Sequence, residues 1–412
     1  MAPSSALKFY FMHFMPYPSL PHDYNDRHKY PSSWVDLPNR LYNPARGHQL
    51  YRRYIDEMVL ADKLGYDGLI INEHHNTAYS MMATCTLIGA AIVERTQRAK
   101  LCVWGVPINL EYPNRLAEEY ATLDVMSGGR VEVAFPLGTG MEYWANAINP
   151  ATGRERMREA LEIILQAWTS DGPTSYYGKY YTYRYLNPWP RPMQQPHPKC
   201  YLVGSGSPEI VELAAELGFG YTVVFVPIAQ QLKTFKLFRE RSVHYGHPTT
   251  PADTPIGVMA YVAESDEIAR REFEPHVRSF FETFLRTQPH YLSPPGYISF
   301  EEFRRRVGSA IDLAKLHGGG SFDWDAFTTH SRIVAGTPER VAESIARWVE
   351  EAQSSTLTCH LHLGDMPHWK TIKNLTLFAE EVIPRLRGIR IGGGDERPEK
   401  TVKAEQVLQA VK

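Results

Sequence analysis

Three segments of this 412-residue chain carry side chains that could do chemistry. The first is Glu73-His74-His75, which follows a buried strand expected over 67–72. An imidazole there could act as an acid or a base, because its charge changes near neutral pH. Adjacent side chains of a strand point to opposite faces, so His74 and His75 are not expected to bind one metal together. Histidines that only form hydrogen bonds at a loop mouth are the alternative interpretation.

The second segment is the turn Gly204-Ser205-Gly206-Ser207-Pro208. Its small residues allow a ligand to approach the backbone, Ser207 can cap the helix that follows, and Pro208 suits the first helical position. Free amides at a helix N-terminus bind phosphate. The turn therefore indicates a phosphate site, and an ordinary capped turn is the alternative.

The third segment is His360-Leu361-His362, which puts two histidines on one face of an expected strand. Zinc hydrolases use this spacing, together with further His, Asp or Glu ligands and an open position for water. Asp365 and Glu73 are the conceivable further ligands. Because a single His-x-His pattern is usually structural, we expect no bound metal.

Short apolar runs alternate with amphipathic helices along the whole chain. Leu50, Tyr54, Met58 and Ala61, for example, form one apolar stripe of a helix. The expected strands cover residues 7–15, 67–72, 101–106, 130–135, 201–203, 221–225, 256–262 and 356–361. The expected helices cover residues 49–64, 81–95, 115–126, 154–168, 208–217, 232–245, 266–286, 337–352 and 371–382, and a surface hairpin is expected over 176–185.

Eight strand–helix alternations predict an α/β fold, a parallel sheet closed as a (β/α)₈ TIM barrel, with the active site at the carboxyl ends of its strands. The predicted single domain covers residues 1–387, with an insertion after strand seven over about 287–335 and a polar C-terminal tail over 388–412. The insertion contains an expected helix over 300–316 and a glycine run at 318–320 that could hinge a lid. An open doubly wound sheet is the alternative, although no Gly-x-Gly-x-x-Gly follows the first strand.

Composition narrows the classes of function. The formal charge is 44 − 46 = −2, so no strong field favours nucleic acid or an anionic membrane. The first ten residues lack the pattern of a signal peptide, and no apolar run is long enough to predict a membrane span. The four cysteines are far apart, which indicates reduced thiols and favours a cytoplasmic location.

Five blocks of the chain together resemble the bacterial luciferase-like, flavin-dependent monooxygenase family. They are GYDGLIINEHH (65–75), YPNRLAEEYATLDVMSGGR (112–130), GSGSPEIVELAAELG (204–218), GTPERVAESI (336–345) and LFAEEVIPRLR (377–387). The second block is the most specific, and the match runs from residue 7 to about residue 387.

The resemblance implies a reaction that uses reduced flavin mononucleotide (FMN) and O₂. Oxygen would attack the flavin C4a, and the hydroperoxide would oxygenate a small organic substrate, while the protein positions the flavin and excludes water. The resemblance also implies a separate NAD(P)H:flavin reductase and pairing of two barrels as a homodimer.

The resemblance also implies roles for individual residues. His74 matches the catalytic histidine of the family, and Glu73 and His75 match its flanking positions. Trp104 and Gly105 match a dipeptide that has a cis peptide bond behind the flavin ring. The other implied flavin contacts are Gly206, Ser207 and Ile210 at the phosphate, and Val224 and Phe225 beside the ring.

One residue of the cofactor site departs from the family. Leu137 stands where an arginine often pairs with the flavin phosphate, and such a charge-assisted contact contributes about 1.5–3 kcal/mol. Without this arginine, we expect either weak binding of FMN or pairing of its phosphate with another cationic side chain. The deazaflavin F420, used by relatives that transfer hydride, is the alternative cofactor. A metal-dependent hydrolase and a non-catalytic flavin-binding protein are further alternatives.

Aromatic residues make up 12% of the chain, and aromatic loops can form the walls of a pocket. The loop over 16–47 and the insertion are expected on the side of the barrel where substrate loops gather. An aromatic lining suits an apolar or ring-bearing substrate, while packing of the loops against the barrel is the alternative. The candidate substrate walls are Tyr17, Trp34, Tyr291 and Tyr297.

Overall fold

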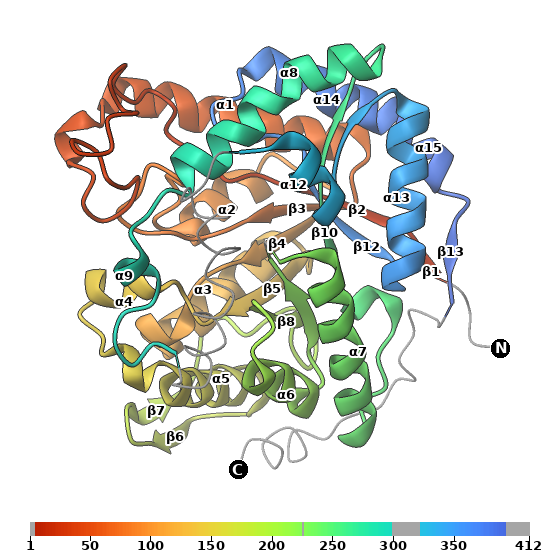
Figure 1. Cartoon of the computed structure of the whole chain (residues 1–412). Coiled ribbons are helices and arrows are strands. Elements are labelled where there is room, and N and C mark those ends of the chain that lie inside the picture. Colours follow the sequence, from red (N-terminus) through yellow and green to blue (C-terminus); the bar gives the residue numbers. More distant parts are fainter. Residues whose placement is uncertain (1–4, 225, 299–321, 393–412) are drawn as a thin grey trace.

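A parallel sheet of nine strands lies at the centre of the molecule (Figure 1). The computed structural model describes residues 5–224, 226–298 and 322–392. The strands are β2 (Lys8–Met12), β3 (Gly68–Ile71), β4 (Lys100–Trp104), β5 (Val131–Pro136), β8 (Lys199–Gly204), β9 (Gly220–Val223), β10 (Ile256–Val262), β11 (Ile333–Gly336) and β12 (Thr356–His360). Their order in the sheet is β11-β10-β12-β2-β3-β4-β5-β8-β9. Apart from β11, they are the eight strands of the predicted TIM barrel.

Helices surround these strands (Figure 1). They are α1 (Pro44–Leu64), α2 (Cys85–Val93), α3 (Pro113–Met126), α4 (Gly140–Ala145), α5 (Gly153–Thr169), α6 (Pro208–Leu217), α7 (Ile228–His244), α8 (Asp266–Ser279), α9 (Pro289–Leu292), α12 (Trp324–His330), α13 (Pro338–Ala352), α14 (His368–Leu377) and α15 (Ile383–Leu386). Within the described ranges, no helix combines the length and the apolar character that crossing a membrane requires.

Helix α1 starts five residues before its expected position. The side chain of Asn43 accepts a hydrogen bond from the backbone N–H of Arg46, and Pro44 occupies the first helical position. Both features stabilise a helix start at this point. Gly65 ends the helix in the left-handed conformation, where a residue without a Cβ is favoured.

Strand β11 corrects the expected extent of the insertion. Residues 333–336 pair in parallel with 259–262 of β10, so they belong to the sheet. The prediction missed this strand because four residues directly before a helix give too short a periodic signal. β9 and β11 are the two ends of the hydrogen-bonded order. Between them, Arg332 donates to the side chain of Gln231 in α7.

Two outlying pairs of strands complete the described fold. The expected surface hairpin is confirmed as β6 (Thr174–Tyr177) and β7 (Thr182–Leu186), which pair antiparallel. β1 (Ser5–Ala6) pairs with β13 (Arg390–Ile391), so the tail expected from residue 388 begins with a strand. The rest of that tail, the expected helix over 300–316 and the glycines at 318–320 lie outside the described residues. The extent of the single domain stays a prediction.

Alternation along the strands separates an outer core from an inner one. In β3, Leu69 and Ile71 pack in the cluster that includes the helices, whereas Ile70 packs in a second cluster with residues of the neighbouring strands. The next positions on the inner face are Asn72 and His74, because side chains of a strand alternate between its faces. The strand therefore delivers His74 to the inner side of the barrel at the carboxyl ends of the strands, the mouth of the barrel.

Candidate functional site

His74 forms a hydrogen-bonded pair with a buried carboxylate. Its Nδ1 lies 2.9 Å from Oε1 of Glu142, in the short helix α4 that follows β5. The other carboxylate oxygen, Oε2, accepts the backbone N–H of Thr139 at 2.7 Å. The side chain of Glu142 is 1% exposed and that of His74 is 20% exposed. The imidazole therefore connects a buried carboxylate with the mouth of the barrel.

The charge of Glu142 follows from these contacts. Burial raises the pKa of a carboxyl group, but the charge of His74, its hydrogen bond and the N–H of Thr139 outweigh burial and hold the pKa of Glu142 below its usual value. The carboxylate is thus kept ionised although it is almost completely removed from water.

Two aromatic rings frame the imidazole. The ring centroids of Trp34 and Tyr79 lie 5.3 and 5.1 Å from that of His74, with interplanar angles of 86° and 67°. The two rings stack on each other at 5.1 Å, and Nε1 of Trp34 donates to the carbonyl of Phe284 at 3.2 Å. Of the four candidate substrate walls, Trp34 is the one that contacts His74 in the described part of the chain.

The other three candidate walls have different positions. Tyr17 is buried in the outer core, among residues of the helices. Tyr291 packs edge-on against Trp144 of α4 at 5.9 Å, and the hydroxyl of Tyr297 donates to the carbonyl of Gly138 at 2.7 Å. Tyr291 and Tyr297 therefore brace α4 and the turn before it. Tyr17 packs its loop against the barrel, which was the alternative to lining a substrate pocket.

Glu73 and His75 make contacts of their own. Oε2 of Glu73 accepts the backbone N–H of Cys85 at the start of α2, at 2.8 Å, and its Oε1 lies 3.4 Å from Nε2 of His75. Burial lowers the pKa of His75, but Glu73 and neighbouring carboxylates, Glu111 among them, outweigh burial and raise it. Glu73, His75 and Glu111 bring ligand-type atoms within 4.8 Å, although Glu73 already holds α2.

The expected cis peptide bond between Trp104 and Gly105 is wrong. The cis bonds of the described residues all precede proline. Gly105 instead has a φ of +151°, and a Cβ there would lie 3.0 Å from the backbone nitrogen of Glu73. The absence of a Cβ at Gly105 therefore allows the close approach of the two strand ends.

Two buried polar atoms near Gly105 have no hydrogen-bond partner among the described residues. They are Nε1 of Trp104, a donor, and Oδ1 of Asn72, an acceptor. The ring of Trp104 packs against Tyr201 at 5.1 Å. Sequence reasoning missed Asn72, although its place two residues before His74 puts it on the same inner face.

The turn over 204–207 has the expected backbone but not the expected cap. Gly206 has a φ of +95°, and its N–H donates to the hydroxyl of Tyr221 at 3.3 Å. The hydroxyl of Ser207 donates to the carboxylate of Glu209, and its side chain makes no capping hydrogen bond to α6. The prediction of a serine cap is wrong because a carboxylate in the first helical turn takes the hydroxyl instead.

The remaining expected flavin contacts flank this turn. Leu137 packs partly against the outer core, and Ile210 is buried in it. Val224 is 41% exposed at the end of β9, and Phe225 lies outside the described residues. In the described ranges, no lysine or arginine forms an ion pair or hydrogen bond with residues 204–207.

His360 and His362 do not share a site. His360 stacks on Phe14 at 5.4 Å, whereas His362 stacks on His13 at 4.3 Å. Burial lowers the pKa of His360 to about 4, and burial together with His13 lowers that of His362 to about 3. Asp365 pairs with a histidine of α8 at 2.7 Å. The conceivable metal ligands are therefore not brought together.

A different group, His13, Glu57 and His362, brings ligand-type atoms within 4.8 Å. Nε2 of His13 lies 2.7 Å from Oε2 of Glu57, and the backbone N–H of Met15 donates to Nδ1 of His13 at 2.8 Å. A neutral imidazole that accepts at Nδ1 carries its proton on Nε2. That nitrogen donates to Glu57, so His13 and Glu57 form a hydrogen-bonded pair, and His362 stacks on the ring of His13.

Comparison with known proteins decides the family. A family model described as luciferase-like monooxygenase matches residues 35–355. The chain belongs to this family. The match covers all strands from β3 to β11 and the histidine at the mouth.

Proteins similar to this chain use two kinds of cofactor, as the names of two of them illustrate. The alkanal monooxygenase alpha chain of Photobacterium leiognathi is 23% identical over 351 residues, 84% of this chain and 96% of that protein. An F420-dependent glucose-6-phosphate dehydrogenase of Amycolatopsis mediterranei is 24% identical over 360 residues, 82% and 95% of the two chains. The FMN complex of the oxygenating constituent of 3,6-diketocamphane monooxygenase from Pseudomonas putida has the same fold, with a TM-score of 0.69, 20% identity and coverage of 93% and 99%.

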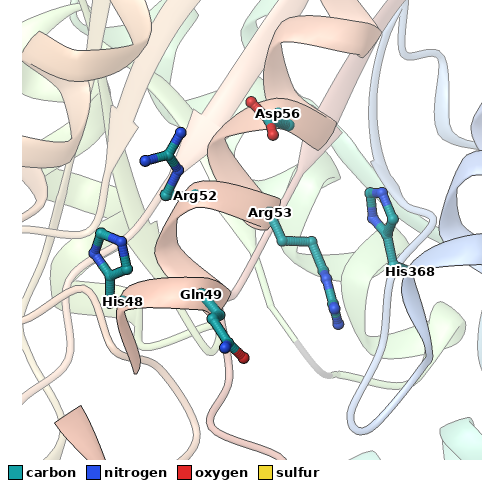
Figure 2. A pocket seen from close by; sticks show the side chains of 6 residues that line it. All are labelled: His48, Gln49, Arg52, Arg53, Asp56 and His368. Carbon is teal, nitrogen blue, oxygen red and sulfur yellow. The ribbon is translucent and has the colours of Figure 1, made fainter. Parts of the chain in front are cut away.

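Two surface hollows in the described part of the chain are lined by residues other than His74. One is an open groove on α1 (Figure 2), and the other lies beside Trp189 after the hairpin. In the groove, His368 approaches α1, and its Nδ1 lies 2.6 Å from Oε1 of Glu57. The groove is lined by His48, Gln49, Arg52, Arg53, Asp56 and His368.

Sequence reasoning also missed Glu142 and Tyr79. A signal for Glu142 was present, because Thr139 and Glu142 form the Ser/Thr-x-x-Glu pattern of a helix start directly after a strand. Tyr79 had no such signal, since it stands in a loop and reaches His74 only through packing.

Proposed function

We propose that this chain is a flavin-dependent monooxygenase that uses reduced FMN and O₂ to oxygenate a small organic substrate, apolar or ring-bearing. The observation that carries the proposal is the pair of His74 and Glu142 at the mouth of the barrel, where His74 matches the family's catalytic histidine. An imidazole held by a carboxylate at one nitrogen has its other nitrogen available to move a proton. When bound, reduced flavin supplies the electrons that activate O₂.

Several residues of this chain suit a flavin. Nε1 of Trp104 and Oδ1 of Asn72 offer one buried donor and one buried acceptor without partners, and the pyrimidine edge of a flavin has both acceptors and a donor. Satisfying such buried atoms contributes about 1–3 kcal/mol each. The turn over 204–207 and the start of α6 offer backbone amides for the phosphate. Val224 is exposed where the family match expects the ring.

The aromatic frame around His74 supports the substrate class. Trp34 and Tyr79 cover the imidazole with apolar rings, and such surfaces favour apolar or ring-bearing molecules. They also limit the access of water to the imidazole. Exclusion of water strengthens the interaction of His74 with Glu142 and suppresses side reactions.

F420 is the second candidate cofactor, and Leu137 favours it. In the described part of the chain, no lysine or arginine pairs with the turn over 204–207, and Leu137 stands where the family often has the phosphate arginine. A phosphate monoester such as that of FMN carries a charge of about −1.5 to −2, whereas the phosphodiester of F420 carries only one negative charge. The missing cation therefore weakens FMN binding more than F420 binding.

The proposal includes a partner that supplies reduced flavin. The chain matches an FMN-bound protein described as an oxygenating constituent, which supports a separate NAD(P)H:flavin reductase. The homodimer and the cytoplasmic location stay predictions.

Anaerobic titration tests the choice of cofactor. Reduced FMN, riboflavin and reduced F420 are added in turn to the full chain, and quenching of its tryptophan fluorescence gives each dissociation constant. The proposal expects saturable binding of reduced FMN and no tighter binding of F420. Tight F420 binding without oxygen consumption would replace the monooxygenase with a hydride-transfer enzyme. Absence of binding by all three flavins would refute both.

A further inference from the structure

We propose that Glu142 is the positioning residue of His74. It fixes the imidazole as the tautomer with the proton on Nδ1 and so leaves Nε2 as the nitrogen that gives or takes a proton at the mouth of the barrel. The catalytic consequence rests on the proposed function, whereas the tautomer is a property of the chain alone.

The hydrogen-bond pattern of the carboxylate fixes the proton. Both oxygens of Glu142 act as acceptors, Oε2 for the N–H of Thr139 and Oε1 for His74. An ionised carboxylate has no proton to donate, so Nδ1 of His74 must carry the one between them. Among the described residues, Glu142 is the only hydrogen-bond partner of the His74 side chain.

The chain holds this carboxylate rigidly. Gly140, at the start of α4, has no Cβ, and a Cβ there would lie 2.6 and 2.5 Å from the carbonyl oxygens of Tyr291 and Leu292. The backbone at the end of α9 therefore packs directly on α4. Tyr297 fixes the preceding turn through Gly138 at 2.7 Å. A carboxylate on such a support orients its histidine without a cost in conformational entropy at each turnover.

Among the residues that the structure describes, no second hydrogen-bond partner competes with Glu142 for Nδ1 of His74. The rings of Trp34 and Tyr79 contact the imidazole by edge-to-face packing. Besides His74, the charge of Glu142 contributes to the pKa of three titratable groups: His75, Tyr79 and Tyr143. The pKa of each tyrosine is raised by burial, so both stay neutral near neutral pH.

The test replaces the carboxylate with an amide of the same shape. In Glu142→Gln, the amide oxygen still accepts from Thr139, and its NH₂ group then faces Nδ1 of His74. An imidazole that must accept at Nδ1 carries its proton on Nε2, so the tautomer inverts. In serine hydrolases, the corresponding amide leaves the geometry intact and inactivates through the wrong tautomer.

The readout is ¹⁵N NMR of the full chain with labelled histidine, at alkaline pH where the histidine ¹⁵N shifts no longer change with pH. The His74 signals are assigned by their loss in His74→Gln. We expect Nδ1–H in the unsubstituted chain, Nε2–H in Glu142→Gln, and no change in Trp369→Phe, a control at an exposed tryptophan of α14. With flavin, Glu142→Gln should lower kcat at least 100-fold and change the dissociation constant of FMN less than twofold.

The outcomes separate the two proposals. Nε2–H in the unsubstituted chain would overturn the positioning role even if Glu142→Gln did not fold. An unchanged tautomer and an unchanged kcat in folded Glu142→Gln would overturn it as well. An inverted tautomer in a chain that binds no flavin would uphold the positioning role and refute the proposed function.

Discussion

Tyr297 donates its hydroxyl to the backbone carbonyl of Gly138 at 2.7 Å, and this contact joins the segment after α9 to the turn that leads into α4. The ring of Tyr297 also packs edge-on against Tyr143 of α4 at 5.6 Å. α4 carries Glu142, which holds His74. Tyr297, which was expected to line the substrate pocket, thus contacts the helix and the turn that position Glu142 against His74.

Tyr297→Phe should reduce turnover although the residue does not contact His74. Loss of this hydrogen bond costs about 0.5–1.5 kcal/mol and loosens the turn before α4. We expect kcat to fall about three- to tenfold with a small change in the melting temperature. Tyr177→Phe, at an exposed tyrosine of the hairpin, is the matched control. Equal kcat values for the two variants would exclude this support.

His74→Gln should abolish most of the turnover and leave the fold intact. General acid–base catalysis contributes about 10²- to 10⁴-fold to a rate, so kcat should fall by that factor. The circular dichroism spectrum and the dissociation constant of FMN should stay close to those of the unsubstituted chain. Full activity in a folded His74→Gln would mean that the proton moves through another group.

Gly105→Ala should destabilise the barrel and disturb the strand end that carries His74. The new Cβ would lie 3.0 Å from the nitrogen of Glu73, at a φ of +151°. We expect a loss of about 2–4 kcal/mol in the free energy of unfolding. The control is Gly128→Ala, where φ is +68° and no atom lies within 4 Å, so only backbone strain of about 1 kcal/mol remains. Urea unfolding measures both, and equal losses would contradict the close approach.

Stability should fall as the pH drops below about 6.5. The pKa of His360 is about 4 and that of His362 about 3, because both are buried. Between these values and about 6.5 the unfolded chain binds protons that the folded chain does not, so acid favours unfolding. Each histidine should contribute about 1.4 kcal/mol per pH unit in that window. Urea unfolding at pH 7, 6 and 5 measures the slope.

His362→Asn provides the control for this pH dependence. Removing one buried imidazole should lower the slope by about one proton, or about 1.4 kcal/mol per pH unit. Replacement of the exposed His290 with asparagine should leave the slope unchanged. A slope that is the same in both variants would mean that His362 titrates normally in the folded chain.

Leu137→Arg should strengthen the binding of FMN if the phosphate lies at the turn over 204–207. A charge-assisted hydrogen bond contributes about 1.5–3 kcal/mol, which corresponds to an affinity gain of about 10- to 100-fold. Riboflavin, which has no phosphate, should bind both chains equally. An equal gain for riboflavin would place the effect on the ring and not on the phosphate.

The strand and the turn that carry the site residues could be predicted from the sequence. One further strand and the hydrogen-bond partners of the site residues could not. The strand before Glu73 and the turn after residue 203 follow from apolar periodicity and glycine spacing, which are local signals. β11 escaped prediction because four residues carry little periodicity. The hydroxyl of Ser207 has two acceptors within reach, and the sequence alone does not say that Glu209 takes it instead of the helix.

The partner of His74 could not be predicted for a different reason. Glu142 lies 68 positions further along the chain, and its contact exists only because β3 and β5 lie on either side of β4. The same holds for His362, which was expected on one face with His360 but stacks on His13, the residue after β2. Spacing along one strand gives the face of a residue, whereas its neighbours depend on how the strands close.

The reaction of the reduced complex with oxygen tests the central claim most directly. The chain is loaded with reduced FMN under anaerobic conditions and mixed with O₂ in a stopped-flow spectrometer. The account predicts a transient absorbance distinct from oxidised and reduced FMN, and a changed decay of that transient in His74→Gln. Direct reoxidation at the rate of free flavin, identical in both chains, would contradict it.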